Sequence, residues 1–173
     1  MAIKFLPLSA IERIFALTNE ELVVLSGGEP FEYDHLPGLF ELLKEVKAPF
    51  RIATGGHIPL ANHGADLKNM PRFVGISLGT DVLSPRSPKY MEHKKIWAAN
   101  VAFLNNHQIP YSLTFTVQGD LNLSKLVSET SALGSAPEFI YLRISSNKNK
   151  QLVQESLQQS FPETFIITDE LQD

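Results

Sequence analysis

Short β-rich runs alternate along this chain with amphipathic segments of helical length, and this alternation restricts the fold more than any other feature. Seven runs predict strands: Ile3–Leu6, Leu22–Ser26, Phe50–Thr54, Phe73–Leu78, Tyr111–Val117, Glu138–Ile144 and Thr164–Thr168. Several are apolar throughout their centres, as strands are when both faces of a parallel sheet are covered. Repeated βα units with short links predict a parallel sheet with right-handed crossovers.

The segments between these runs carry helix signals. Ser9 and Glu12 form a capping box that predicts the start of the first helix. Asp34 is predicted to cap the second helix, with Pro37 in its first turn. The apolar face of that helix comprises Leu36, Leu39, Phe40, Leu43 and Val46. Further helices are predicted over Ser87–Asn106, Asn122–Leu133 and Lys150–Gln159, and a shorter, weaker one within Ile58–Met70.

These elements predict the α/β class, and an open, parallel-stranded partial TIM barrel is one architecture that they allow. We expect a single domain over residues 1–173. Six or seven βα units are too few for a complete eight-stranded barrel, which takes about 250 residues. A flat, doubly wound sheet is the other architecture that the alternation allows. In both, the ligand site lies at the carboxyl ends of the strands.

Composition excludes several kinds of chemistry. The 173 residues include no cysteine, so the chain has no disulfide, thiolate zinc site, cysteine nucleophile or cysteine-ligated iron–sulfur cluster. Fifteen basic against nineteen acidic residues give a net charge of −4 without a basic patch, which argues against binding nucleic acid or an anionic membrane. No apolar stretch approaches the ~20 residues of a membrane span, and the N-terminus does not resemble a signal peptide. We therefore expect a cytoplasmic protein.

Polar residues and glycines gather directly after the predicted strands. The second and third strands are followed by Ser26-Gly27-Gly28-Glu29-Pro30 and Thr54-Gly55-Gly56-His57, and the fourth by Gly79-Thr80-Asp81. Paired glycines let backbone amides approach a ligand closely, although tight turns alone explain them equally well. Glu29, His57 and Asp81 would suit an acid–base group, but solvated turn residues are the favoured interpretation.

Arg143, at the end of the sixth predicted strand, is the best-placed cation for an anionic ligand or a peptide carboxylate. Pairing with Asp169 or Glu138 is the alternative. Gly75, Ser77 and Gly79 match the Gly-x-Ser-x-Gly pattern of a hydrolase elbow. That motif needs a helix directly after the serine, whereas a loop is predicted here, so a Ser77 hydrolase is disfavoured.

The run from Leu22 to Pro30 resembles the second strand and GGEP motif of the radical S-adenosylmethionine (SAM) enzymes. Phe50–Gly56 is similar to that family's third strand, which commonly ends in Thr-Asn-Gly, and Phe73–Leu78 is similar to its fourth. The match continues in order over most of residues 1–145. It implies a partial (βα)6 barrel.

The resemblance also implies a ligand site. In the family the GGEP motif contacts the methionyl amino group of SAM, which assigns that role to Gly27, Gly28 and Glu29. Polar residues of the following strands contact the ribose and carboxylate, a role that Ser77 and Thr116 could take here. Thr54 completes this set of SAM-binding candidates, and His57, Asp81 and Arg143 are further ligand candidates.

The sequence departs from the family at the loop after the first strand, where three cysteines usually hold a [4Fe–4S] cluster. Here the first strand ends at Leu6, and only Pro7 and Leu8 separate it from the capping box that begins at Ser9. The five histidines lack metal-ligand spacing. Gly55 and Gly79 replace the family's usual asparagine and aspartate. We therefore expect no iron–sulfur cluster, no metal and no catalytic residue, with SAM as the one cofactor that the resemblance allows.

These observations favour a non-catalytic binding or accessory protein, whose partner is a peptide substrate or an active radical SAM enzyme, as in peptide natural-product modification. The first alternative is an enzyme that reuses the barrel to bind SAM or another small molecule without a cluster. The second is one part of a split radical SAM enzyme whose cluster module lies on another chain.

Overall fold

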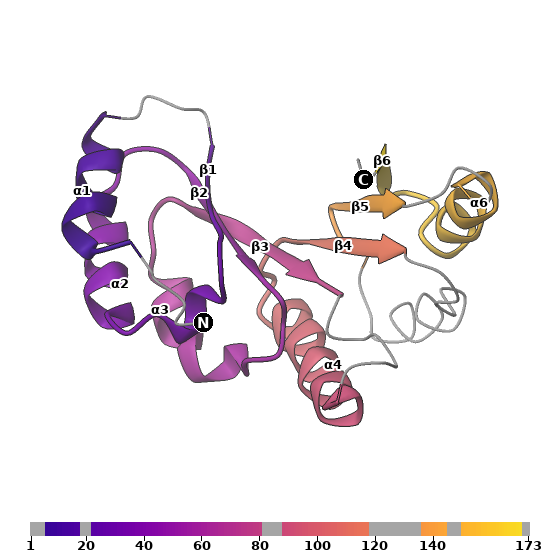
Figure 1. The fold of residues 1–173 in the computed structure, drawn as a ribbon, viewed down its shortest axis with the longest axis horizontal. Coiled ribbons are helices and arrows are strands. Elements are labelled where there is room, and N and C mark those ends of the chain that lie inside the picture. Colours follow the sequence, from indigo (N-terminus) through magenta and orange to yellow (C-terminus); the bar gives the residue numbers. More distant parts are fainter. Residues whose placement is uncertain (1–5, 18–21, 81–87, 118–135, 145–149, 171–173) are drawn as a thin grey trace.

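A computed structural model of the chain describes residues 6–17, 22–80, 88–117, 136–144 and 150–170. Six parallel strands form one sheet in the order β1-β2-β3-β4-β5-β6 (Figure 1). Their bounds are β1 Val23–Leu25, β2 Phe50–Thr54, β3 Phe73–Gly79, β4 Tyr111–Val117, β5 Phe139–Ile144 and β6 Phe165–Glu170. A doubly wound sheet reverses its strand order at a switch point, whereas this order is sequential as in a barrel wall. The predicted α/β partial barrel is therefore confirmed.

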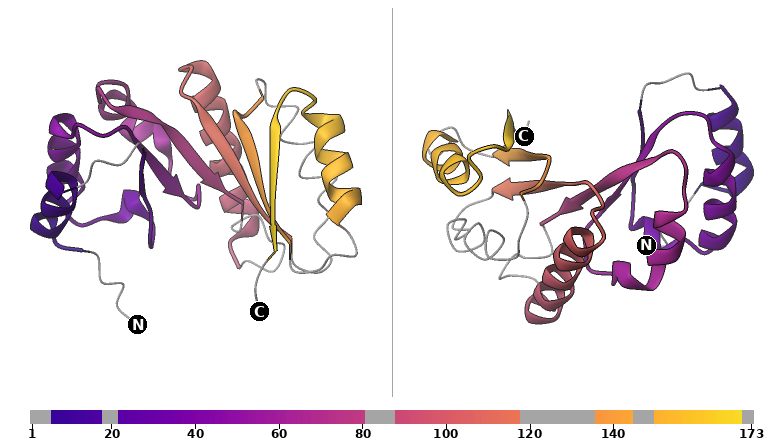
Figure 2. Two further views of the ribbon diagram at one scale, coloured as in Figure 1. Left: turned by 90° about the horizontal axis from the view of Figure 1, so that it is seen from above. Right: turned by 180° about the vertical axis from the view of Figure 1, so that it is seen from behind.

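Helices and short 3-10 turns connect the strands and follow the outside of the curved sheet (Figure 2). The helices are α1 Leu8–Leu17, α2 Leu36–Glu45, α3 Gly64–Lys68, α4 Tyr90–Asn106 and α6 Lys150–Ser160. The 3-10 turns are η1 Pro30–Glu32 and η2 Leu60–His63. None of the helices in these described segments is long and apolar enough to cross a membrane.

The core lies between the helices and the outward-facing side chains of the strands. Alternate residues of a strand point to opposite faces, and the outward set is fully buried in the central strands: Ile76, Leu78, Leu113, Phe115, Ile140 and Leu142. The predicted apolar face of α2 is confirmed, because all five of its residues are buried. In α4, Trp97, Val101 and Leu104 are buried, whereas Ile96 and Phe103 are only half-buried.

Two helices begin at other residues than the capping signals predict. Helix α1 begins at Leu8, and the Pro7 carbonyl accepts N–H groups of its first turn, so Ser9 lies inside the helix rather than at its cap. Helix α2 begins at Leu36, two residues beyond the predicted cap Asp34.

The delayed start of α2 has a local cause. The chain after β1 first forms the 3-10 turn η1, and the Leu36 N–H then donates to the Tyr33 carbonyl. His35 consequently takes the cap position, while Pro37 lies in the first turn as predicted. Two further predictions, the helix Asn122–Leu133 and residues 3–5 of the first strand, fall outside the described residues.

Gly75 allows β3 and β4 to approach each other closely. Its φ of +140° is one that L side chains rarely adopt, and a Cβ there would lie 2.3 Å from the Pro110 carbonyl oxygen. The Gly-x-Ser-x-Gly segment lies entirely within β3, so Ser77 sits in mid-strand and no strand-to-helix elbow exists. The glycine is needed for strand packing rather than for a nucleophile.

Candidate functional site

Glu29, the acid of the GGEP segment, is a buried carboxylate surrounded by donors from its own chain. It is 4% exposed. One oxygen, Oε2, accepts from the Thr54 hydroxyl at 2.8 Å and from the Gly55 N–H at 3.0 Å. The other, Oε1, accepts from the Phe31 N–H at 3.3 Å and caps η1. Glu29 thus joins the loop after β1 to the loop after β2.

Helix α4 fixes the loops at the carboxyl ends of β2 and β3. The Asn100 side-chain amide donates to the carbonyls of Gly56 at 3.0 Å and Ile58 at 2.8 Å. Its carbonyl accepts from the Leu60 N–H at 2.8 Å. The Trp97 indole donates to the Gly79 carbonyl at 2.9 Å. Neither residue was predicted as part of the site, because only the packed α4 brings Asn100 to a loop 40 to 44 residues earlier and Trp97 to Gly79, 18 residues earlier.

His57 lies between two carboxylates, those of Glu29 and Glu32, of which only Glu29 was predicted to be near it. Its Nδ1 is 3.6 Å from Glu29 Oε2, and its Nε2 is 3.5 Å from Glu32 Oε1. The ring centroid of His93 is 5.5 Å away. Among the described residues, however, no group of three or more histidine, aspartate or glutamate side chains is arranged to hold a metal ion. Asp81, the third member of the predicted acid–base group, is outside the described residues.

His63 packs against aromatic rings on the outer side of the sheet. Its ring centroid is 5.1 Å from that of Phe31, and it meets Phe40 edge to face. Burial lowers the pKa of His63, and the nearby Asp66 carboxylate opposes this shift only in part. His63 is therefore favoured as a neutral packing residue.

A polar network crosses the concave face of the sheet and includes Ser77. The buried guanidinium of Arg51 donates to the Ser112 hydroxyl at 3.1 Å, and Ser112 donates to the Ser77 hydroxyl at 3.2 Å. Arg51 also pairs with Glu138 at 2.5 Å and lies over the Phe139 ring. Sequence reasoning missed Arg51, although a lone charge in the apolar run Phe50–Thr54 was a signal.

Thr116 and Arg143 lie in register on neighbouring strands. In the strand register, Thr116 of β4 lies opposite Arg143 of β5, and Arg143 lies opposite Asp169 of β6. Arg143 is exposed. Glu138 pairs with Arg51 instead, and Arg143 makes no ion pair in the part of the chain that the structure describes.

Tyr141 donates its hydroxyl to Asp169 Oδ2 at 2.8 Å. This hydrogen bond raises the pKa of Tyr141 above its ordinary value of 10, and Arg143 opposes the shift. The stability that the bond contributes is present below pH 10 and is lost as the pH rises through the folded-state pKa. Ultraviolet difference titration of the protein against its Tyr141→Phe variant should show this late ionisation. Asp169→Asn should bring it back toward pH 10, and an unchanged titration would contradict the bond.

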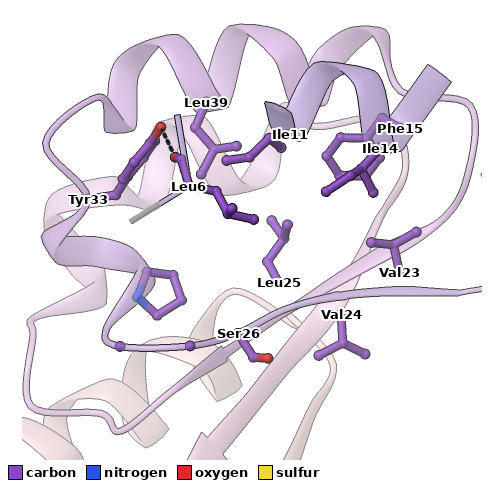
Figure 3. A pocket seen from close by; sticks show the side chains of 13 residues that line it. Leu6, Ile11, Ile14, Phe15, Val23, Val24, Leu25, Ser26, Tyr33 and Leu39 are labelled. Atoms are coloured by element: carbon purple, nitrogen blue, oxygen red, sulfur yellow. Dashed lines mark hydrogen bonds between the residues drawn. The ribbon is translucent and has the colours of Figure 1, made fainter. Parts of the chain in front are cut away.

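An apolar groove borders the exposed Gly27-Gly28 loop (Figure 3). It has a volume of about 450 Å³ and lies between α1 and the edge strand β1. Its lining is mainly aliphatic and aromatic: Leu6, Ile11, Ile14, Phe15, Val23, Val24, Leu25 and Leu39, with Ser26, Pro30 and Tyr33. The Tyr33 hydroxyl donates to the Leu6 carbonyl at 2.9 Å and closes one wall.

The sequential parallel sheet, the outer helices and the glycine loops at the strand ends define a partial TIM barrel. No protein-family model matches the sequence, and no curated protein does. Two solved structures of Streptococcus suis SuiB resemble this one. SuiB bound to S-adenosylmethionine has a TM-score of 0.71 at 14% identity, over 94% of this chain and 42% of that chain. SuiB bound to its precursor peptide SuiA has a TM-score of 0.72 at 13% identity, over 96% and 43%.

A domain of pyruvate-formate lyase-activating enzyme from Bacteroides vulgatus is similar as well. Its TM-score is 0.66 at 15% identity, over 85% of this chain and 98% of that domain. The present chain spans less than half the length of the SuiB chain. These likenesses establish the fold, and the absence of cysteine removes the usual ligands of an iron–sulfur cluster.

Proposed function

We propose that this protein is a non-catalytic binding protein on a radical-SAM-type barrel, which holds a peptide for modification by a partner enzyme. One observation carries the proposal: the Glu29 carboxylate, which the GGEP resemblance assigns to SAM, has both oxygens bonded to donors of its own chain. A carboxylate used in this way serves the fold and has little capacity left for an ammonium group. The chain also has no thiolate to place iron beside SAM.

The groove beside the Gly27-Gly28 loop supports a peptide as the ligand. Its lining is apolar, and its floor includes an edge strand whose outer side has no neighbour among the described strands. Extended peptides bind such edges through backbone hydrogen bonds and place alternate side chains in apolar hollows. The fold likeness to SuiB, which has been crystallised with a precursor peptide, agrees with this assignment.

SAM titration tests the non-catalytic part of this proposal. We expect no saturable heat in calorimetry and no change in the melting temperature. A ligand at about 100 times its dissociation constant would add about 2.7 kcal/mol, which a thermal shift detects easily. Ser77→Ala provides the matched variant. A melting temperature that SAM raises in the wild type but not in this variant would overturn the proposal.

A peptide titration tests the other part. The probe is the precursor peptide SuiA, with which the structurally similar SuiB was crystallised, measured by calorimetry against the same peptide with its residues in scrambled order. We expect saturable binding of the first and none of the second. Equal binding, or binding of neither, would contradict a peptide-holding function.

The conformation of the glycine loop favours a second candidate, an enzyme that binds SAM or another small molecule without a cluster. Gly27 and Gly28 are exposed and have φ values of +96° and +62°. Their amides could meet a ligand that also contacts Thr54, Ser77 or Thr116.

If the chain is instead one part of a split radical SAM enzyme, it should co-purify with a cysteine-bearing partner and restore that partner's cleavage of SAM.

A further inference from the structure

The apolar groove beside β1 has a backbone edge as well as apolar walls. The Val23 N–H donates to the Pro49 carbonyl at 2.9 Å, so it points toward β2. Successive residues of a strand turn their N–H and C=O groups to opposite edges, and each C=O points away from the next N–H. The carbonyls of Leu22 and Val24 and the N–H groups of Val24 and Ser26 therefore point away from β2. None of these groups is bonded to another described residue.

Helix α1 lies over this free edge without burying any of its residues. By contrast, α2 and α4 each bury four residues in the core. The apolar residues Ile11, Ile14 and Phe15 of α1 face the same groove as Leu25 of β1 (Figure 3). Ile14 remains 50% exposed. The helix and the free edge thus border a space at which one further strand can extend the sheet.

The free edge is complementary to an extended backbone. Its carbonyl oxygens carry partial negative charge and its N–H groups carry partial positive charge, and the two alternate along the strand. A second extended backbone has the same alternation and can pair with these groups, as neighbouring strands of a sheet do. A lipid or another apolar small molecule would fill the groove but leave the edge without partners.

A second copy of this chain does not fit through the same edge. Two β1 strands related by a two-fold axis would place both α1 helices on one side of the joined sheet, over the same space. Each α1 already lies beside the free edge of its own β1, because the two elements line one groove. A separate peptide has no such helix.

The two faces of β1 determine which side chains the added strand needs. Val24 and Leu25 point to opposite sides of the strand (Figure 3). Val23 and Leu25 pack partly against the core, whereas Val24 is 49% exposed. The side chains of an added strand alternate in the same way. Those beneath α1 are therefore apolar and two positions apart, and the residue between them lies beside Val24 and can be polar.

We propose that the groove binds a peptide segment as an additional strand beside β1, with two apolar side chains two positions apart beneath α1 and its N–H groups bonded to the carbonyls of Leu22 and Val24. This inference rests on the proposed peptide-binding function and specifies how the peptide is held and what it contains. The backbone bonds give affinity for an extended segment, and the apolar pair gives the selectivity.

The first test changes only the peptide. A displayed library of random peptides of about twelve residues, which cover a strand and its flanks, is selected on the full-length protein. We expect enriched peptides to share an apolar–polar–apolar segment. The best peptide is then N-methylated at one residue at a time. Binding should weaken at least about tenfold at two residues two positions apart and little at the residue between them, because only alternate N–H groups meet β1.

The second test changes the edge of the protein. Val24→Pro removes an N–H from the free edge but none of the bonds to β2, and edge strands tolerate proline at such positions. It should weaken binding of the best peptide at least about tenfold. Val24→Ala is the matched control, because it keeps the N–H, and its affinity should stay within about threefold of the wild type.

The third test changes the wall of the groove. Ile14→Thr should weaken binding about fivefold, because apolar burial against the peptide is lost. Leu17→Thr on the same helix should leave binding unchanged, because Leu17 is 81% exposed and does not line the groove. Circular dichroism should verify that every variant is folded.

N-methylation without alternation, or peptides whose affinity none of these substitutions changes, would overturn this inference but leave a peptide-binding function intact. A library without enrichment would overturn both. Sedimentation that shows a dimer disrupted by Val24→Pro would assign the edge to a second copy instead. Much tighter peptide binding by an Ile3→Ser, Phe5→Ser variant would assign the groove to the chain's own first residues and would also overturn the inference.

Discussion

Replacing Gly75 with alanine is expected to destabilise this protein more than any other single methyl addition at a described glycine. The new Cβ would lie 2.3 Å from the Pro110 carbonyl oxygen, a backbone atom that also accepts the Ile76 N–H. Neither strand can move without breaking the pairing of β3 with β4. The residue would also keep a φ of +140°. We expect a loss of at least about 3 kcal/mol in the free energy of unfolding, measured by urea titration.

Gly27→Ala separates the two causes of that loss. Gly27 has a φ of +96°, but nothing lies within 4 Å of a Cβ built there. Its substitution should therefore cost only the backbone strain, about 1 kcal/mol. If Gly75→Ala yields no soluble protein while Gly27→Ala folds, the steric cause is supported. Equal losses in the two variants would show that β3 and β4 are not held as closely as described.

Replacing Glu29 with glutamine is expected to have the second-largest effect. Three donors converge on this carboxylate, from Phe31, Thr54 and Gly55. Both oxygens of the carboxylate accept hydrogen bonds. In either orientation, a glutamine amide therefore turns its NH₂ group toward a group that is itself a donor, and that hydrogen bond is lost. The site is 4% exposed, so water cannot easily replace the lost bonds. We expect a loss of about 3 kcal/mol in urea unfolding.

The matched substitution is Glu32→Gln in the same 3-10 turn. The Glu32 side chain is 48% exposed and lies 3.5 Å from His57 Nε2, so its change should stay within about 0.5 kcal/mol. A Glu29→Gln variant as stable as the wild type would mean that the carboxylate does not hold the two loops together. If that variant also lost a measurable affinity for SAM, Glu29 would be a ligand contact, and the non-catalytic proposal would fail.

The strands could be predicted from local pattern because the core-facing residues of each strand are apolar and several strands are apolar throughout their centres. Two of the six described strands, β2 and β4, have the bounds that the sequence predicts, and the other four differ by one or two residues at one or both ends. Of the first predicted strand, Ile3–Leu6, only Leu6 is described, and it is not in a strand. Helix starts were less accurate. The capping potential of Ser9 and Asp34 competes with the turns that the chain makes before each helix, and those turns depend on Pro7 and on η1.

For the candidate site, the sequence predicted the location, at the carboxyl ends of the strands, but not the hydrogen bonds within it. Sequence order places Glu29 and His57 after neighbouring strands, and they do lie together. Which groups each one bonds depends on distances across the fold. Glu29 meets Thr54 twenty-five positions later, and Asn100 reaches Gly56 from a helix more than forty positions away. No spacing rule connects these residues, so a motif suggests their position but not their partners.

The ion pair of Arg51 with Glu138 limits which fragments of the chain can fold without leaving a buried charge unpaired. It links β2 to the residue just before β5, across two intervening strands and 87 positions of sequence. A fragment that ends after β4 would hold a guanidinium, 7% exposed in the intact protein, with its carboxylate removed. We therefore expect the central βα units to unfold together, so that they cannot be removed from the barrel one at a time without leaving this charge unpaired.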